Sequence, residues 1–445
     1  MHPEPPVALA VVGAGNRGAD VYARYALEHP DQARVVAVAE PDPGRRRALA
    51  RAHGIPAGRC FDDWRRLLAE PRLADAVVIA TPDRVHVEPA LAALEQGYDV
   101  LLEKPIAPEV DDILRLAEAA RKARGAVTVA HVLRYTPFFT TIQRLLAAGA
   151  VGRPVVIEHQ ENIGYWHFAH SYVRGNWRRA AASSPMILAK ACHDLDLLRW
   201  FAGAPCAEVA SFGALVHFRP ENAPAGVPAR CTDGCPAAAS CPFDAVAMYV
   251  DGMNGRTGWP VSVVTPERDR EARLEALRRG PYGRCVYRCD NDVVDHQVVS
   301  LRFVNGLVAS LTVAAFTVDN TRTLRVLGTR GELQGHMERG EILVRAFRPG
   351  MTATPPAGDG WERILVPAGS GHAGGDQGLM QDFIRRLRAR RRGLEPEESR
   401  TSLRETVESH LMALAAEQAR RERRVVRMEE MWAAGWSPEA RSPGQ

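Results

Sequence analysis

A glycine-rich turn directly after a short apolar run constrains the fold more than any other feature of the chain. Val7–Val12 is uninterrupted and apolar, as in a parallel strand buried on both faces. Gly13, Gly15 and Gly18 follow, and apolar residues then return at helical spacing. In such a unit the glycines allow a tight turn, the approach of a pyrophosphate, and close packing of helix on strand. The sequence therefore predicts a strand, turn and helix that bind a dinucleotide.

A carboxylate after the next strand strengthens this prediction. Residues 34–39 form a second apolar run that ends at Glu40, about 20 residues beyond the turn, where a carboxylate binds the ribose hydroxyls of the cofactor. Glu40 would repel a ribose 2′-phosphate, which favours NAD over NADP. Arg45, Arg46 and Arg47 follow, and an arginine there could accommodate that phosphate. NADP therefore remains the less favoured alternative.

The alternation of strands and helices predicts an α/β fold with two domains. Strands are expected at 76–80, 98–103 and 126–130, and helices between them at 62–70, 87–96 and 110–124. This order is typical of a doubly wound parallel sheet, the Rossmann fold, which we assign to residues 1–132.

From Arg153 onward, strand-like segments follow one another with few helices between them. This pattern predicts an α+β domain over residues 133–425 with a large, open, mostly antiparallel sheet. A helix is expected over 185–202, a loop over 357–374, helical structure over 375–418, and a tail over 426–445. Residues 219–292 have little periodicity and are interpreted as an insertion. The strand-like segments are 155–161, 208–218, 293–304, 307–318, 323–327 and 342–347.

Composition narrows the class of protein. Of 445 residues, 46% are hydrophobic and 25% are charged, as in an ordinary globular protein. No apolar run is long enough for a membrane span, and the first residues do not resemble a signal peptide, so a cytoplasmic protein is expected. The net charge is only +4. The basic runs 385–392 and 420–424 lack interleaved aromatic residues, so they are interpreted as solvated helix faces and not as a nucleic-acid surface.

Several motifs together resemble one known family. The glycine turn is followed by Ala80-Thr81-Pro82-Asp83 with His86, by Glu103-Lys104-Pro105, by His131-Val132-Leu133-Arg134-Tyr135, and by a helix that contains His193-Asp194-Leu195-Asp196-Leu197-Leu198. In this order the motifs resemble the glucose-fructose oxidoreductase, inositol dehydrogenase and rhizopine-catabolism (Gfo/Idh/MocA) family over nearly the whole chain. The resemblance implies nicotinamide-dependent redox chemistry at a carbinol carbon of a sugar or cyclitol. The expected cofactor-binding residues are Gly13, Gly15, Asn16, Arg17, Gly18, Glu40, Thr81, Pro82, His86, Glu103 and Lys104.

Lys104 is the first candidate catalytic residue. It follows a predicted parallel strand, at the sheet edge where ligands bind, and an ammonium there can stabilise a substrate oxygen that gains charge. The resemblance implies a position beside the nicotinamide and substrate.

His193 is the candidate general base, because imidazole titrates near neutral pH. Family members often carry an aspartate four residues earlier, whereas this chain has Ala189 followed by Lys190. Lys190, a third candidate catalytic residue, is expected one helical turn from His193, where its charge would lower the pKa of the histidine. Asp196 could orient the imidazole.

Further polar residues are candidates for substrate contact. They follow the last Rossmann strand, precede or lie on the helix of His193, or lie in the predicted loop before the C-terminal helical region. These residues are His131, Arg134, Tyr135, Trp177, Asp194, Asp196 and His372.

Five of the eight cysteines are grouped within the insertion. Close thiols in a reducing compartment more often hold a metal than form disulfides. Zinc takes four thiolates, so Cys231, Cys235, Cys241 and Cys285 are the expected ligands, with Cys289 as the alternative fourth. An iron-sulfur cluster or no metal remain alternatives, because the spacing is unusual. Cys60, Cys192 and Cys206 are interpreted as small core residues.

Two reactions fit these residues. The first is oxidation or reduction of a carbinol carbon by hydride transfer with NAD. The second is glycoside cleavage through oxidation, elimination, water addition and reduction, with no net redox change. Either uses a small carbohydrate as substrate. A homo-oligomer is expected, a dimer or tetramer joined through the second sheet.

Overall fold

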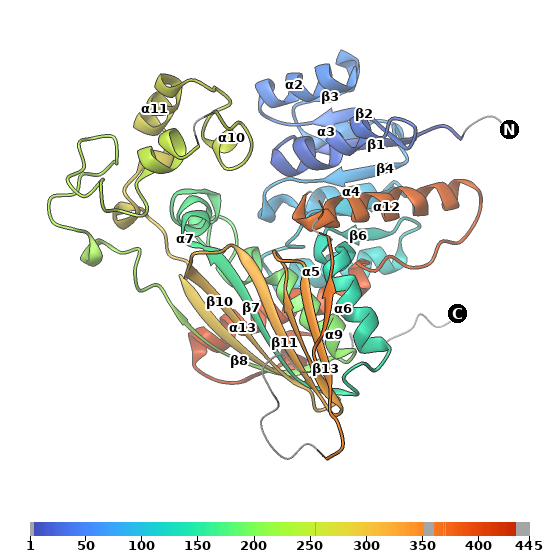
Figure 1. The fold of residues 1–445 in the computed structure, drawn as a ribbon. Coiled ribbons are helices and arrows are strands. Elements are labelled where there is room, and N and C mark those ends of the chain that lie inside the picture. Colours follow the sequence, from blue (N-terminus) through green and yellow to red (C-terminus); the bar gives the residue numbers. More distant parts are fainter. Residues whose placement is uncertain (1–3, 254, 351–359, 368, 370, 433–445) are drawn as a thin grey trace.

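The computed structural model describes residues 4–253, 255–350, 360–367, 369 and 371–432, which form two sheets connected by helices (Figure 1). The first sheet has six parallel strands and the second has nine strands in a mixed, mostly antiparallel arrangement. The insertion between β8 and β9 projects from the end of the second sheet beside the first domain (Figure 1). The predicted fold class is confirmed.

The first sheet has the strand order β3-β2-β1-β4-β5-β6, and all its neighbouring strands are parallel. Every residue of β4, β5 and β6 is buried, because helices cover both faces of the sheet. The strands are β1 Val7–Val12, β2 Ala33–Ala39, β3 Cys60–Phe61, β4 Ala76–Ile79, β5 Asp99–Leu102 and β6 Val127–Val129. The helices are α1 Arg24–Glu28, α2 Pro43–His53, α3 Trp64–Ala69, α4 Val87–Glu95 and α5 Val110–Lys122.

The second sheet has the order β14-β13-β12-β11-β7-β10-β9-β8-β15. Strands β7 and β10 pair in parallel and the other neighbours are antiparallel. Along β9 and β10 buried residues alternate with more exposed ones, so helices cover one face only. The strands are β7 Pro154–Gly164, β8 Cys206–Ala214, β9 His296–Phe303, β10 Val308–Thr317, β11 Thr321–Gly328, β12 Gly331–His336, β13 Glu341–Ala346, β14 Glu362–Leu365 and β15 Val426–Arg427.

Helix α13 lies between the two sheets. It contacts α5 and β6 of the first domain, and α9 and β8 of the second. Buried side chains of both domains and of α13 therefore pack in one continuous core. The remaining helices are α6 Pro137–Ala147, α7 Tyr165–Phe168, α8 Met186–Ala189, α9 Cys192–Ala202, α10 Val261–Val264, α11 Arg270–Arg279, α12 Gly375–Arg391 and α13 Leu403–Glu422.

The structure differs from the sequence prediction in several elements. It adds β3, α6 and two helices of the insertion, α10 and α11, which were not predicted. The helix expected over 185–202 is interrupted at residues 190–191. Strand β12 was not predicted, because its two glycines weaken the strand pattern. Strand β14 lies within the expected loop over 357–374, of which residues 357–359, 368 and 370 lie outside the described residues. Strand β15 pairs with β8, so residues 426–427 belong to the sheet and not to a tail.

Helix α12 packs against the first sheet, although it follows the second in sequence. Its apolar side chains, among them Leu379, Phe383 and Leu387, share a core with Val7, Leu9 and Val11 of β1. The chain thus returns to the dinucleotide domain after completing the second sheet. None of the helices in the described part of the chain is both long and apolar enough to span a membrane.

Candidate functional site

The glycine-rich turn has the shape that a dinucleotide phosphate requires. Gly13 has a φ of +93°, and a Cβ there would lie 2.5 Å from the carbonyl oxygen of Ala80. A Cβ at Gly18 would overlap the carbonyl oxygen of Gly13, whereas one at Gly15 would meet no heavy atom within 4 Å. Gly15 therefore leaves open space before the helical turns that begin at Asn16, where backbone N–H groups favour a phosphate. These residues fit the predicted dinucleotide.

The carboxylate of Glu40 lies against this turn. One of its oxygens accepts a hydrogen bond from the N–H of Ala14 at 2.7 Å, and the other accepts one from Asp42 at 3.0 Å. Arg46 donates to the carbonyl oxygens of Glu40 and Pro41, so a positive charge lies on the same backbone turn. Glu40 has the predicted position, and its contact with a ribose stays a prediction.

Arg17, which was expected at the cofactor, has its guanidinium occupied by other groups of the protein. It forms ion pairs with Glu103 and, at 2.9 Å, with Asp376, and it donates to the hydroxyl of Tyr22 at 2.7 Å. These contacts connect the turn to the end of β5 and to α12. Asn16 hydrogen-bonds within its own helical turns. Arg17 therefore connects the turn to the neighbouring elements, and its contact with a phosphate stays a prediction.

His86 is buried between the loops that follow β4 and β5. Its Nε2 lies 2.8 Å from the carbonyl oxygen of Thr81, and its Nδ1 lies 2.6 Å from that of Pro105. The imidazole therefore fixes the loop of Thr81 and Pro82 beside Lys104. We assign His86 a supporting position next to the predicted cofactor site.

The ammonium of Lys104 reaches from the first domain to the second. It follows β5, and its Nζ donates a hydrogen bond to the carbonyl oxygen of Ala189 at 2.8 Å. Its backbone N–H donates to the carboxylate of Glu103 at 3.0 Å. Burial would raise the pKa of Glu103, but the charges of Arg17 and Lys104 outweigh burial and lower that pKa. A permanently ionised Glu103 thus helps to hold the lysine in place.

His193 lies in the first turn of α9, beside His131 at the end of β6. The Nδ1 atoms of the two rings are 3.3 Å apart, and the rings meet edge to face. Burial, then the positive charge of Lys104, lower the pKa of His193 well below its ordinary value. The imidazole is therefore neutral near pH 7, and Nε2 can accept a proton from a substrate in the tautomer whose Nδ1 donates to His131.

Lys190 does not act on His193 as the sequence predicts. The helix breaks after Ala189, so Lys190 is not one regular turn from the histidine. Its Nζ forms an ion pair with Glu161 of β7 at 3.2 Å. Burial lowers the pKa of Lys190, and Glu161 opposes that effect. The pKa of His193 is indeed lowered, but the lysine chiefly responsible is Lys104.

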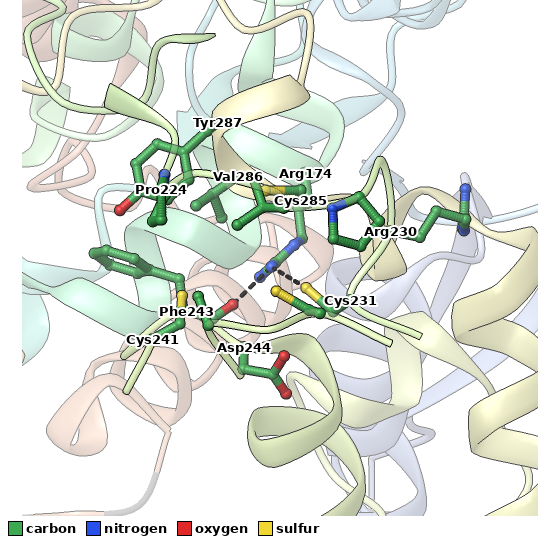
Figure 2. Close-up of a pocket in the computed structure, with 14 residues that line it drawn as sticks. Arg174, Pro224, Arg230, Cys231, Cys241, Phe243, Asp244, Cys285, Val286 and Tyr287 are labelled. Carbon is green, nitrogen blue, oxygen red and sulfur yellow. Dashed lines mark hydrogen bonds between the residues drawn. The ribbon is translucent and has the colours of Figure 1, made fainter. Parts of the chain in front are cut away.

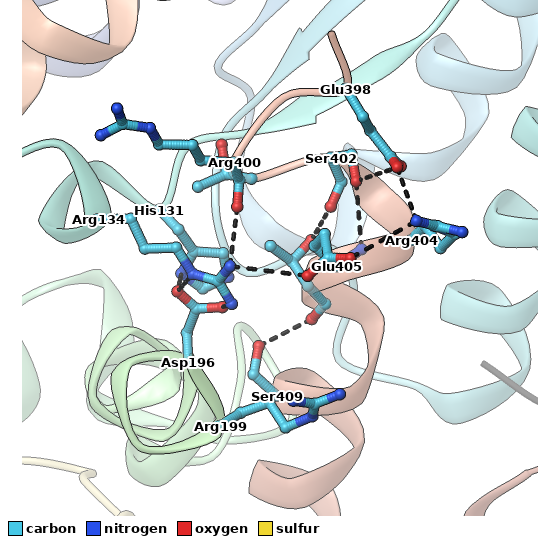
Figure 3. A network of polar contacts seen from close by, with 12 residues as sticks. His131, Arg134, Asp196, Arg199, Glu398, Arg400, Ser402, Arg404, Glu405 and Ser409 are labelled. Atoms are coloured by element: carbon cyan, nitrogen blue, oxygen red, sulfur yellow. Dashed lines mark hydrogen bonds and ion pairs between the residues drawn. The ribbon is translucent and has the colours of Figure 1, made fainter. Parts of the chain in front are cut away.

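The prediction that Asp196 orients His193 is wrong. Asp196 accepts two hydrogen bonds from Arg134, at 2.7 and 2.8 Å, and Figure 3 shows the two side chains facing each other. Arg134 also donates to the carbonyl oxygen of Arg400 before α13 at 2.8 Å. His131 is 3.9 Å from the Asp196 carboxylate. The pair therefore joins α9 to β6 and α13, because a bidentate ion pair fixes both side chains.

Asp194 is buried in a second ion-pair cluster. It contacts Nε2 of His159 at 2.7 Å and Nε of Arg322 at 2.7 Å, and Arg322 also pairs with Glu161. Burial opposes ionisation, but the charge of Arg322 and the bond from His159 lower the pKa of Asp194. These partners occupy Asp194. A direct substrate contact stays a prediction, as it does for Asp196.

Three further candidates have partners within the protein. The hydroxyl of Tyr135 lies 3.1 Å from Asp382, and burial raises the pKa of Tyr135 to about 12. Trp177 donates from Nε1 to Asp83 at 3.4 Å. His372 is half-exposed, and its Nδ1 lies 2.9 Å from Asp376. Of the three, His372 is the one whose charge lowers the pKa of His193, which places it near the candidate base.

Sequence reasoning missed the charged cluster beneath the site. His159 and Glu161 both face the buried side of β7, whereas Glu158 and Gln160 face the open side. Charged or polar residues at the inward positions of a strand cost stability unless they are paired. The alternation of inward and outward positions along β7 places His159 and Glu161 inward, and this pattern could have revealed the cluster from the sequence.

The cysteines of the insertion come together, but not as a formed metal site. Four of them, Cys231, Cys235, Cys241 and Cys285, line one small cavity (Figure 2). Within the described residues, no three His, Cys, Asp or Glu side chains are placed to hold an ion together, so zinc is not supported by their present positions. Cys289 donates instead to the carbonyl oxygen of Cys285 at 3.3 Å. Cys192 and Cys206 are buried, as predicted.

Two models of one family match the chain. Residues 7–131 match the NAD-binding Rossmann fold of the GFO/IDH/MocA oxidoreductase family, and residues 139–334 match the GFO/IDH/MocA C-terminal domain. The chain belongs to the GFO/IDH/MocA oxidoreductase family. The resemblance expected from the motifs is confirmed.

Among curated relatives, the chain is 25% identical to YteT of Bacillus subtilis, described as an oxidoreductase, over 73% of this chain and 74% of that protein. It is 34% identical to inositol 2-dehydrogenase 4 of Saccharopolyspora erythraea, over 49% of this chain and 60% of the relative. The match thus spans about three-fifths of that dehydrogenase.

Solved structures share the fold. Levoglucosan dehydrogenase in complex with NADH is 19% identical, with a TM-score of 0.67 over 95% of this chain and 99% of that one. An oxidoreductase from Agrobacterium radiobacter in complex with NAD+, L-tartaric acid and magnesium is 16% identical, with a TM-score of 0.66 over 96% of this chain and 99% of that one.

Proposed function

We propose that the protein oxidises a carbinol carbon of a sugar or cyclitol by transferring hydride to NAD. The arrangement of Lys104 and His193 carries this proposal. The two residues come from different domains, and the ammonium of Lys104 reaches the carbonyl oxygen of Ala189, four residues before His193. Burial and then the charge of Lys104 lower the pKa of His193. A neutral base and a cation side by side suit removal of a hydroxyl proton. Curated inositol dehydrogenases among the relatives support the substrate class.

The chain's own residues perform the proton chemistry. His193 accepts the hydroxyl proton at Nε2, while its Nδ1 is held by the ring of His131. Lys104 stabilises the oxygen that becomes negative, and the carbonyl of Ala189 fixes its ammonium. When bound on the turn of Gly13, Gly15 and Gly18, the nicotinamide cofactor supplies the hydride acceptor. Lys190, paired with Glu161, is proposed to contact the substrate hydroxyls.

A screen of substrates tests this function. Purified protein is incubated with NAD+ and, separately, with inositols, free sugars and glycosides, and NADH absorbance and product release are recorded. We expect NADH to accumulate with at least one cyclitol or sugar. Glycoside cleavage without NADH accumulation would instead establish the glycoside-cleaving reaction.

The cofactor preference depends on Glu40. Glu40→Gln is expected to weaken NAD binding by about 1–3 kcal/mol, because a charge-assisted hydrogen bond to the ribose is lost. The glutamine oxygen can still accept from the N–H of Ala14, but its NH2 group cannot accept from the N–H of Asp42, so thermal unfolding of the variant is measured alongside binding. Calorimetric titration with NAD and NADP measures the change, with the exposed Glu28→Gln variant as the control. Tighter binding of NADP than NAD by the native protein would contradict the NAD assignment.

We also propose a homo-oligomer joined through the open face of the second sheet. Phe212 and Val298 are register partners on this face, and Phe316 lies on the same side of β10. All three are more than a third exposed, and exposed large apolar side chains on one sheet face favour an interface. Light scattering that gives the mass of one chain would exclude the oligomer.

A cytoplasmic location is proposed because all eight cysteines are free thiols.

A further inference from the structure

The insertion gathers its cysteines from both of its ends. Cys231, Cys235 and Cys241 lie in its first part, Cys285 lies after α11, and all four line one cavity (Figure 2). The backbone already joins these ends, because the N–H of Cys231 donates to the carbonyl oxygen of Gly283 at 2.9 Å. An ion in this cavity would therefore connect the two ends of the insertion.

A buried arginine lines the same cavity. Arg174 is 0% exposed, and its guanidinium donates at 2.7 Å to the carbonyl oxygens of Arg284 and Phe243. Its Nη2 also lies 3.6 Å from Sγ of Cys231 (Figure 2). Nη1 has no hydrogen-bond partner of acceptable geometry, although the hydroxyl of Tyr249 lies nearby.

Arg174 has no ion-pair partner within the described residues, whereas the buried Arg134 and Arg322 each pair with an aspartate. The carboxylate of Asp244 lines the same cavity, but it accepts a hydrogen bond from the N–H of Ala247 and forms no ion pair with Arg174. A buried cation without an ion-pair partner is unfavourable. Neutral thiols cannot balance it. Four thiolates around one divalent cation carry a net charge of −2, and metal-bound sulfur accepts N–H hydrogen bonds, so such a site would supply what Arg174 lacks.

We propose that Cys231, Cys235, Cys241 and Cys285 bind one zinc ion, with Arg174 donating a hydrogen bond to the Cys231 thiolate. The cavity is small and is lined by these four cysteines, and four thiolates are a complete ligand set for one tetrahedral zinc. Cys289 is left out of the proposed ligand set, because it does not line this cavity and its thiol donates to the carbonyl oxygen of Cys285.

Binding requires the four sulfur atoms to converge on one point. Zinc–sulfur bonds are about 2.3 Å long, and the four side chains do not yet converge to that distance. Rotation of each cysteine about its Cα–Cβ bond turns its sulfur toward or away from the cavity. On binding, each thiol releases one proton to solvent, and the zinc holds the ends of the insertion together.

Metal analysis tests the site. Full-length protein purified without chelator is expected to contain about one zinc per chain. Cys231→Ser and Cys235→Ser should reduce zinc below a tenth of that and lower the melting temperature, because structural zinc contributes to folding. Cys206→Ser, which changes a lone buried cysteine, should keep the full zinc content. Folded, zinc-free native protein with five titratable thiols in the insertion, or protein with iron and acid-labile sulfide, would overturn the proposal.

Cobalt replacement tests the ligands without relying on folding of the cysteine variants. Co²⁺ exchanged into the native protein should give the absorption bands of a tetrahedral thiolate site. Arg174→Gln should retain these bands and weaken metal binding by about 10–100-fold, as loss of an outer hydrogen bond does. Unchanged affinity in Arg174→Gln would refute the role of the arginine, and octahedral cobalt bands in the native protein would refute the thiolate ligands.

Discussion

Lys104→Ala is expected to lower kcat by about a hundredfold or more while leaving the affinity for NAD nearly unchanged. The ammonium acts on charge that develops on the substrate oxygen in the transition state, so its loss affects kcat more than binding. In the structure the ammonium is held at 2.8 Å by the carbonyl oxygen of Ala189, which places it at the domain boundary. Steady-state kinetics and calorimetry measure the two quantities. Lys122→Ala, at an exposed lysine, should behave like the native protein.

His193→Ala should cause a loss of similar size, and the two losses should not add. If the lysine fixes the oxygen and the histidine takes its proton, each variant already removes what the other residue needs. The double variant should therefore be little slower than either single one. Full additivity of the two losses in kcat would contradict a shared step.

The pH dependence of kcat/KM distinguishes loss of the base from loss of folded protein, because unfolding lowers activity without shifting the acid limb. His193 must be neutral to accept a proton, and burial and Lys104 lower its pKa well below 6.5. The acid limb of kcat/KM should consequently lie below pH 6.5 in the native protein and shift in His193→Ala. If His193→Ala turns over substrate with an unshifted acid limb, another residue must be the base, and Lys190 is the next candidate. Tyr135 is a poor base, because burial raises its pKa to about 12.

Arg322→Met is expected to lower the free energy of unfolding by about 3–5 kcal/mol, the usual result of removing one partner from a buried ion pair. Arg322 pairs with both Asp194 and Glu161, so its loss leaves two buried carboxylates with too little positive charge. Urea denaturation measures the change. Arg24→Met, which breaks an exposed pair with Glu28, should change stability by about 1 kcal/mol or less. A loss that small in Arg322→Met would refute the structural role of the cluster.

The same cluster predicts an acid dependence. The pKa of Asp194 is lowered in the folded state, so the unfolded state binds more protons at acidic pH. The stability from Asp194 is therefore complete above its unfolded pKa, about 3.9, and is lost as pH falls through the lower folded value. This decline should be weaker in Arg322→Met.

Local sequence patterns were sufficient to predict the dinucleotide part of the site. An apolar run, three glycines and Glu40 lie within about 35 residues, and each acts through its own backbone position or strand. Strand and helix ends of the first domain followed from periodicity for the same reason. In the structure, the second glycine of this pattern, Gly15, faces open space, and a Cβ there would meet no heavy atom within 4 Å.

The contacts of the candidate site residues on and before α9 were not predictable from local patterns. The pairing of Lys190 with Glu161, and of Asp194 with Arg322, depends on β7 and β11 lying side by side under α9. Asp196 was assigned to His193 from helical spacing, but Arg134, 62 residues away, binds it more strongly than a nearby imidazole could. An ion pair between distant segments thus determines the contacts of Asp196, and spacing along one helix did not predict them.

Transfer of deuterium tests the central claim most directly. A substrate found in the screen is labelled with deuterium at its carbinol carbon and mixed with the protein and NAD+ in a single turnover. The account predicts that deuterium appears in the reduced cofactor and that the rate falls, while Lys104→Ala and His193→Ala transfer it at least about a hundredfold more slowly. Reduced cofactor without deuterium, or native transfer rates in both variants, would contradict it.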